Sequence, residues 1–338
     1  MPTGVPIAAL RLLFLCCLSV ASLLFLCSSW YGIGVSANSP AVRWSLGLQA
    51  LRRDRAVVAL ESSVLAQGLP VPANRDAHRR MCNAVAAHHA APAVLAVVRG
   101  VPTAGLEGDD LERFLRRDGV SKVSARDLGW ACARALDGAT TVAASLALAA
   151  AAGIDVFATG GIGGVHREPP FDESADLLEL SRTSVVTVCA GVKSILNLPA
   201  TLERLESYGV AVIGFGTDEF PGFFTRRSGL RVAASTDDPA EIAQAFRAQR
   251  ALGLPGAVLV VQPPPAGSAL DERLVEDAVQ RSLVAARSAG VTGAQVTPFL
   301  LAAVERETGG ASLGANLALL EANAALAARI AVALREGG

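Results

Sequence analysis

Lysine is almost absent from this sequence, although basic residues as a class are not. Of its 30 lysine and arginine residues only two are lysines, Lys122 and Lys193. Arginine stays protonated in proteins and cannot act as an amine nucleophile, whereas a lysine can once its pKa is lowered. Both lysines stand beside turns that follow short apolar runs. We therefore interpret them as functional residues, the alternative being that a bias in base composition left them by chance.

Charge of either sign is also scarce. Charged residues make up 18% of the chain, the net charge is −1, and no block of basic residues occurs. This composition argues against electrostatic capture of nucleic acid. The chain also lacks CxxC and Cys/His spacings, which argues against structural zinc. The isolated cysteines Cys82, Cys132 and Cys189 are typical of buried thiols in a reduced, intracellular protein.

Acidic residues are missing from the first 50 positions, and residues 12–27 carry no charge at all. This pattern predicts a hydrophobic leader over residues 1–41, ahead of a folded domain at 42–338. The leader could be a signal peptide, with a small-residue cleavage site at 35–37, or a membrane anchor that is short for a span. Any membrane contact is expected only through residues 12–27.

Two other origins of the leader stay open, and so does the location of the protein. An organelle-targeting segment is less favoured because arginine is sparse there. A non-native extension from a wrong start codon is also possible, but the next methionine, Met81, lies beyond residues that the site needs.

Short apolar runs alternate with helical stretches from about residue 42 onward. The expected strands cover residues 56–60, 93–98, 156–159, 185–189, 210–215 and 258–261. The expected helices cover residues 74–89 (capped by Asn74), 111–117, 124–136 (opened by a capping box), 138–152, 239–250, 272–289, 298–308 and 313–335. This alternation predicts a layered α/β/α domain with a mostly parallel central sheet.

Polar residues follow four of the expected strands, namely Glu61, Thr159, Lys193 and Asp218. The carboxyl ends of parallel strands share one edge of a sheet, and ligands bind there. We therefore expect a carboxylic acid, an amine nucleophile and a possible metal carboxylate to meet in one crevice. A purely structural alternative for Glu61 is a buried ion pair with an arginine.

The glycine-rich loop after residues 156–159 adds His166, Asp172 and Asp176 to this edge. Carboxylates in such a loop could hold a hard divalent cation, or could simply favour the start of a helix near Ser174. The glycines themselves do not predict a dinucleotide site, because His166 stands where the third glycine of that fingerprint belongs. Similarly, Val192 stands where the ATP-binding loop has a glycine, so the sequence does not predict ATP hydrolysis. Backbone amides at the start of a helix could still bind an anionic phosphoryl group.

Long collinear motifs run through the predicted domain. They are VVALESSVLAQGLPVPAN (57–74), SKVSARDL (121–128), GATTVAASL (138–146), FATGGIGGVHR (157–167), FDESADLLEL (171–180), VCAGVKSILNLPATLERLESYGVAVIGFGTDEFPGFF (188–224), VTPFLL (296–301) and SLGANLALL (312–320). Together they resemble the pseudouridine-5′-phosphate glycosidase family, also called the indigoidine synthase A-like family. The resemblance covers nearly the whole chain from about residue 42.

The resemblance implies reversible cleavage of the C–C glycosidic bond of pseudouridine 5′-phosphate, giving uracil and ribose 5-phosphate through a lysine iminium. It implies Lys193 as the nucleophile, Glu61 as the proton donor and Asp172 as the site of one Mn²⁺ per subunit of a homotrimer. The substrate-binding residues that it implies are Lys122, Val142, Ser174, Ala175 and Asp176, with Thr159, His166 and Asn316 facing the uracil.

Two departures from the family pattern stand near the site. The loop at 166–172 is shorter than is usual in the family, and Ser63 stands where a threonine is common. Two other functions stay open: another Schiff-base enzyme acting on a sugar phosphate, such as an aldolase, and a noncatalytic, membrane-tethered relative.

Overall fold

The computed structural model describes residues 42–168, 172–291 and 296–337. The predictions for the leader at 1–41 lie outside these residues, and so do positions 169–171 of the shortened loop. The division of the chain into 1–41 and 42–338 therefore stays a prediction.

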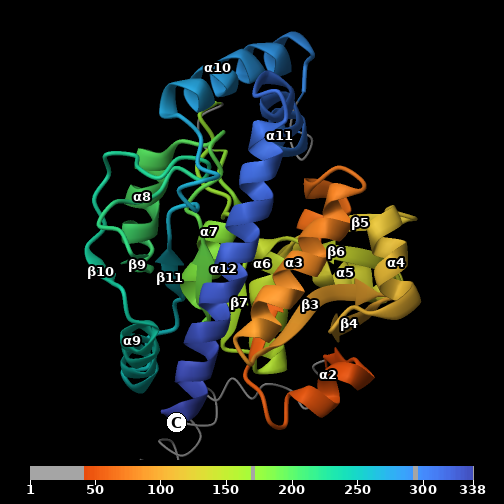
Figure 1. The fold of residues 1–338 in the computed structure, drawn as a ribbon. Helices are drawn as coiled ribbons and strands as arrows, with labels where there is room; N and C mark the ends of the chain where they lie inside the picture. Colours follow the sequence, from red (N-terminus) through yellow and green to blue (C-terminus); the bar gives the residue numbers. More distant parts are fainter. Residues whose placement is uncertain (1–41, 169–171, 292–295, 338) are drawn as a thin grey trace, which may run out of the picture. The chain divides into compact units, whose positions relative to one another are not determined.

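The strands form one mixed, mostly parallel sheet (Figure 1). Its main order is β1 (Arg43–Trp44), β4 (Val101–Ala104), β3 (Ala91–Val98), β2 (Val57–Leu60), β7 (Val156–Ala158), β8 (Val186–Cys189), β11 (Val258–Val261), β9 (Ala211–Phe215) and β10 (Ala234–Thr236). Strand β6 (Asp137–Thr140) pairs with β3 and with β5 (Val120–Val123). Only the pairs that β3 makes with β4 and β6 are antiparallel among the described strands. The prediction of a mostly parallel α/β sheet is confirmed.

Three neighbouring strands end at the same level, and this register positions the site. Leu60 of β2 lies opposite Ala158 of β7, which in turn lies opposite Val188 of β8. All three residues are buried and apolar, as expected for strands covered on both faces. The first polar residues after these strands therefore emerge side by side.

The helices surround this sheet. They are α2 (Leu46–Leu51), α3 (Ala73–Ala87), α4 (Gly108–Arg116), α5 (Leu128–Ala133), α6 (Val142–Ala152), α7 (Ala175–Arg182), α8 (Leu198–Ser207), α9 (Pro239–Ala251), α10 (Glu272–Ser288), α11 (Val296–Glu307) and α12 (Ala311–Glu336). In Figure 1, α12 and α3 run side by side in front of the strands, while α10 and α11 lie beyond the sheet at the top.

The apolar helix α12 belongs to the core. It packs against α3 and against strands β2, β7 and β8. Within the described residues it is the one helix long and apolar enough to cross a membrane, but half of its most apolar 18-residue window is buried inside the molecule. Burial of that kind is typical of a core helix, in which apolar residues face protein on most sides.

One predicted helix start proved to be a strand. Residues 138–141 were expected to open the helix that continues to Ala152, but β6 occupies Asp137–Thr140 and α6 begins only at Val142. The Thr140 amide donates to Ser62 Oγ and its hydroxyl donates to the Leu95 carbonyl, each at 2.8 Å. Pairing with two neighbouring strands therefore outweighs local helix propensity at these positions.

Asn74 is a second correction, because it does not cap its helix. Pro72 occupies the N-cap position of α3, and Asn74 is fully buried as the second residue of the helix. Its side-chain amide instead donates to the carbonyls of Leu65 and Leu115, at 3.0 and 2.9 Å. Asn74 therefore ties three segments of the chain together rather than terminating one. The expected capping box at Ser124 is present, with Asp127 Oδ2 accepting the Ser124 amide at 3.0 Å.

Candidate active site

A pocket lies where β2, β7 and β8 end and where α11 and α12 pass over the sheet edge. It encloses about 540 Å³ of empty space, part of it open to solvent. Five of the residues predicted from the sequence line it: Glu61, Lys122, Thr159, Lys193 and Asn316. The pocket thus brings together a carboxyl group, two amines and two polar side chains from distant parts of the chain.

Glu61 is held at both of its carboxyl oxygens. It is only 5% exposed, and it follows directly after the buried strand β2. The Thr159 hydroxyl donates to Oε2 at 2.6 Å, and the Ser63 hydroxyl donates to Oε1. The alternative of a buried pair with an arginine is wrong, because two hydroxyl groups satisfy this carboxyl group. Hydroxyl groups can either donate or accept, so they can hold the group before and after it gives up a proton.

Thr159 is in turn fixed from α12. The Asn323 amide donates to the Thr159 carbonyl at 2.8 Å and to the Gly160 carbonyl at 3.2 Å. Gln262, which follows β11, donates to Asn323 Oδ1 at 2.9 Å. Asn323 is 1% exposed in a mostly apolar helix. Its hydrogen bonds to the turn after β7 explain why a polar residue is buried here.

Lys122 lies close enough to Lys193 for the charge of Lys193 to act on its pKa. The residue Lys122 as a whole stays exposed on β5, but surrounding protein atoms and the charge of Lys193 lower the pKa of its amine. Glu61 and Asp176 act on this pKa in the opposite direction, which places both carboxylates near Lys122. Lys193 is partly buried, and no partner for its amine is found among the described residues. The amine of Lys193 is therefore available to a substrate in the pocket.

Glycines allow three loops to close around Lys193. A Cβ atom on Gly161 would lie 2.6 Å from the Phe223 ring, and one on Gly191 would lie 2.3 Å from the Pro221 carbonyl oxygen. Gly191 also has a φ of +91°, a conformation that residues with a side chain rarely adopt. The glycines of these motifs therefore serve close packing of the loops. This role agrees with the prediction that they do not form a nucleotide-binding loop.

Asp176 organises a second cluster beside the pocket. Its two oxygens accept the backbone amides of Ala143, at 2.9 Å, and Gly163, at 2.8 Å. It thereby joins the start of α6, which begins with the buried Val142, to the glycine-rich loop. Ser174 caps α7 by accepting the Asp176 amide at 3.2 Å, and Ala175 follows as an exposed residue. These four predicted substrate-binding residues lie next to each other, but they do not line the pocket itself.

His166 and Asp172 form a pair in the same loop. His166 Nδ1 lies 3.8 Å from Asp172 Oδ2, and the His166 amide donates to the Asp172 carbonyl at 2.9 Å. The Asp172 side chain is 39% exposed. In residues 42–168, 172–291 and 296–337 no group of three or more His, Cys, Asp or Glu side chains is arranged around a metal position. The pair can therefore offer one carboxylate and one imidazole, with the remaining ligands coming from water or substrate.

The expectation that Asp218 would join the site is wrong. Its carboxylate pairs with Arg231, and it does not line the pocket. The reason lies in the strand order, since β11 is inserted between β8 and β9 and so moves the end of β9 away from Lys193. Residues that line the pocket and were not predicted are Ser63, Val64, Gln67, Gly68, Gly160, Gly161, Phe223, Thr297, Pro298 and Leu301. Ser63, Gln67, Phe223 and Thr297 could have been suspected as polar or aromatic positions within the quoted motifs, whereas nothing in the sequence pointed to Asn323.

The family model described as indigoidine synthase A like protein matches residues 48–333. The chain belongs to the indigoidine synthase A-like family. Two curated relatives are named pseudouridine-5′-phosphate glycosidase. The protein of Gemmatimonas aurantiaca is 64% identical over 289 residues, which cover 86% of this chain and 94% of the relative. The protein of Herpetosiphon aurantiacus is 50% identical over 287 residues, which cover 84% and 95%.

Two solved structures of this indigoidine synthase A-like fold are similar to the chain. The prealnumycin C-glycosynthase AlnA, in complex with ribulose 5-phosphate, is 37% identical with a TM-score of 0.81, covering 88% of this chain and 97% of AlnA. An indigoidine synthase A-like protein from Thermotoga maritima is 36% identical with a TM-score of 0.78, covering 83% and 94%. The family resemblance and the fold inferred from the sequence motifs are thus confirmed.

Proposed function

We propose that this protein is a pseudouridine-5′-phosphate glycosidase, which splits its substrate reversibly into uracil and ribose 5-phosphate. The observation that carries the proposal is the pocket in which Lys193 lies with the doubly held carboxyl group of Glu61. The names of the relatives support the same activity. A carbon–carbon bond to a base needs an electron sink on the sugar and a proton for the base, and these two residues supply both.

Lys193 opens the reaction. Its neutral amine attacks C1′ of the ribose, the C1′–O4′ bond breaks, and the proton that the nitrogen loses passes to O4′. The nitrogen now bonded to C1′ holds a lone pair that can stabilise positive charge there. Arginine at this position could not form this bond, which explains a lysine in an arginine-rich protein.

Glu61 then protonates C5 of the uracil. As the C1′–C5 bond breaks, its electrons return to the uracil ring, and the nitrogen lone pair of Lys193 forms the C1′=N double bond of the iminium. Uracil leaves with the proton from Glu61, which is now a carboxylate. Water hydrolyses the iminium to ribose 5-phosphate and frees Lys193. Ser63 and Thr159 keep the carboxyl group aimed at C5 throughout.

The remaining predicted residues bind substrate in this proposal. Lys122, which lines the pocket, offers its amine to the phosphate, and the Val142 and Ser174–Asp176 cluster shapes the sugar-phosphate side. Asn316 Oδ1 is buried without a partner among the described residues, so it can accept a uracil N–H together with Thr159 and His166.

We infer that Asp172, with His166 beside it, holds one Mn²⁺. The donor set fits a hard cation that keeps several water ligands, because the carboxylate is partly exposed and lies 3.8 Å from an imidazole nitrogen. A bound Mn²⁺ would supply positive charge that neutralises substrate oxygens. Asp172 would orient it from the loop that Asp176 anchors.

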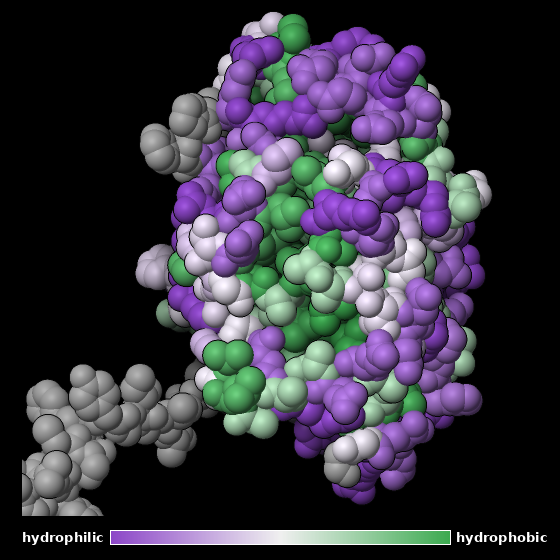
Figure 2. Space-filling view, turned by 90° about the vertical axis from the view of Figure 1, so that its left-hand side faces the viewer, coloured by the Kyte–Doolittle hydropathy of each residue, from purple (hydrophilic) through white to green (hydrophobic). Residues whose placement is uncertain are grey.

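We also infer a homotrimer. Figure 2 shows apolar side chains gathered in a hollow on one face of the molecule, with hydrophilic residues around them. Apolar surfaces of this kind mark contacts with other chains or ligand-binding grooves, and the number of three subunits is what the family resemblance implies. Sedimentation of the full-length protein will give about three times the 34.7 kDa mass of one chain if the inference is right.

The decisive experiment is to trap the iminium on the full-length protein. Pseudouridine 5′-phosphate is added with Mn²⁺, uracil release is followed, and sodium borohydride then reduces the iminium to a stable amine. We expect mass spectrometry to find the ribose phosphate adduct on Lys193. Lys193→Arg should release no uracil and form no adduct. Lys122→Arg is the matched control, since it removes the other lysine and should still form the adduct. An adduct on Lys122, or uracil release by Lys193→Arg, would refute the assigned nucleophile.

The similarity to AlnA favours a second candidate, the joining of a sugar phosphate to a different carbon nucleophile. AlnA is a C-glycosynthase whose structure contains ribulose 5-phosphate. The same amine and carboxyl pair could serve that reaction or an aldolase-type cleavage. Borohydride trapping with ribose 5-phosphate, ribulose 5-phosphate and other sugar phosphates, compared with uracil release, separates these activities.

A further inference from the structure

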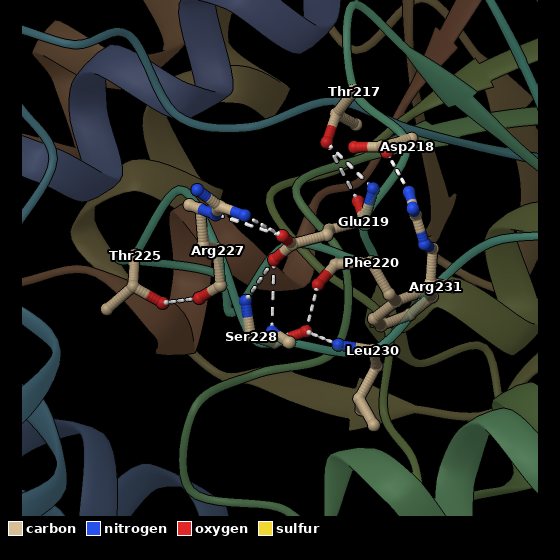
Figure 3. Close-up of polar contacts among 10 residues, drawn as sticks. Thr217, Asp218, Glu219, Phe220, Thr225, Arg227, Ser228, Leu230 and Arg231 are labelled. Carbon is tan, nitrogen blue, oxygen red and sulfur yellow. Dashed lines mark hydrogen bonds and ion pairs between the residues drawn. The ribbon is translucent and has the colours of Figure 1, made fainter.

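A buried carboxylate lies at the centre of the loop at residues 217–231, which follows β9 (Figure 3). Glu219 is 8% exposed and accepts hydrogen bonds from the Arg227 guanidinium, through Nε at 2.9 Å and also through Nη2. The backbone amides of Ser228 and Gly229 donate to its other oxygen at 3.3 and 3.0 Å. These donors, Arg227 above all, lower the pKa of Glu219 to about 2. The carboxylate therefore fixes the two arms of the loop to each other.

Further hydrogen bonds close the same loop below Glu219. The Phe220 amide donates to the Leu230 carbonyl at 2.7 Å, and the Ser228 hydroxyl donates to the Phe220 carbonyl. The Gly222 amide donates to the Thr225 carbonyl at 3.1 Å. The tip at residues 221–224 is therefore held in one conformation by the rest of the loop.

This tip presses an aromatic residue against the loops of the active site. The Phe223 amide donates to the Ala190 carbonyl at 3.1 Å, and Gly222 forms a bridge with Gly191, two residues before Lys193. Phe223 has a φ of +68°, a left-handed conformation that is rare for a residue with a large side chain. Conformations of this kind persist where the surrounding structure enforces them, and they are common at functional sites.

The Phe223 side chain is 2% exposed and lines the same pocket as Glu61, Thr159 and Lys193. Its ring lies against the backbone of Gly161, where any Cβ atom would collide with it. Val64 and Leu301 add further apolar surface to the pocket. One wall of the pocket is therefore aromatic and apolar, whereas the catalytic groups are polar.

We infer that Phe223 is a specificity residue, against whose ring the planar base of the substrate packs, and that the Glu219-centred loop exists to hold it there. This inference rests on the proposed function and names the part of the substrate that the loop recognises. Aromatic side chains bind bases by stacking, whatever the hydrogen-bonding pattern of the base. Ribose 5-phosphate has no base, so its binding does not depend on this wall.

The test compares three variants of the full-length protein. Phe223→Gly removes the ring and suits the positive φ, so the backbone stays unstrained, but the loss of a buried ring should lower the melting temperature, and the kinetics are measured well below that temperature. The variant should raise KM for pseudouridine 5′-phosphate by about tenfold or more, the size expected from loss of a stacked ring. The inhibition constant of ribose 5-phosphate should change by less than about twofold. Phe223→Tyr keeps the ring and should restore a KM near that of the wild type.

Phe246→Leu is the control, because it removes a buried aromatic ring from α9, away from the pocket. It should lower the melting temperature and leave KM unchanged. A wild-type KM in Phe223→Gly, or an equal rise in Phe246→Leu, would overturn the inference while the proposed function stands. A wild type that neither binds nor cleaves pseudouridine 5′-phosphate would overturn both. A parallel loss of ribose 5-phosphate binding would place the ring on the sugar and also refute the inference.

Discussion

At the scale of single residues, the structure adds two partners to Glu61, the predicted proton donor. Glu61 was expected from its place after a strand, but the two hydroxyl groups that hold its oxygens were not. The sequence marks Ser63 only as a departure from a common threonine. Because Ser63 donates directly to Glu61, the hydroxyl group is what matters at this position, and serine and threonine both supply it.

Ser63→Ala should therefore slow the reaction. Loss of a hydrogen bond to a carboxyl group should lower kcat by about tenfold, because the proton donor is no longer fixed, and it should leave KM nearly unchanged. Ser63→Thr keeps the hydroxyl group and is expected to retain wild-type kcat. Steady-state rates of uracil release across pH measure both variants. Equal rates for Ser63→Ala and Ser63→Thr would show that the hydrogen bond has no role in the chemistry.

At the scale of secondary-structure elements, the sequence indicates where strands end but not which strands are neighbours in the sheet. Glu61, Thr159 and Lys193 meet because β2, β7 and β8 are neighbours. Asp218 does not, because β11 comes later in the sequence yet lies between β8 and β9. Local patterns indicate where a strand ends, but the order of strands depends on how long-range packing buries them, so a single sequence could not place β9.

The loop after β9 should also carry a pH dependence. The pKa of Glu219 is lowered in the folded protein to about 2 from 4.5. A lowered pKa stabilises the folded state when the carboxyl group is ionised, so the contribution is present above about pH 4.5 and is lost as the pH falls toward 2. Glu219→Gln should therefore lower the melting temperature at pH 7, and the difference from the wild type should shrink between pH 4.5 and 2.

Thermal unfolding at closely spaced pH values measures this difference. Asp218→Asn is the matched control, since that carboxylate is exposed and pairs with Arg231 in the same loop. Exposed pairs contribute little to stability, so its melting temperature should stay near that of the wild type throughout. A Glu219→Gln difference that is constant with pH would show that the ionised form makes no special contribution.

At the scale of the whole molecule, one apolar cluster runs through the described residues from end to end. A single apolar cluster includes Val42 and Leu48 near one end of the described chain and Ile330 and Ala331 near the other. The family match at 48–333 covers nearly the same residues. Every residue that lines the active-site pocket also belongs to this range. The family match and the pocket thus both lie within the predicted domain at 42–338.

Protein lacking residues 1–41 should therefore fold and act like the full-length chain. We expect an unchanged melting temperature and unchanged kcat and KM for uracil release, because the buried cluster and the pocket are complete without the leader. Binding to lipid vesicles should be lost, since the apolar stretch at 12–27 is the segment that suits a membrane. Flotation of both proteins with vesicles, beside the kinetic assay, measures the two effects separately. Lost activity in the shortened protein would mean that the leader completes the enzyme, whereas vesicle binding by both proteins would transfer the membrane contact to the folded domain.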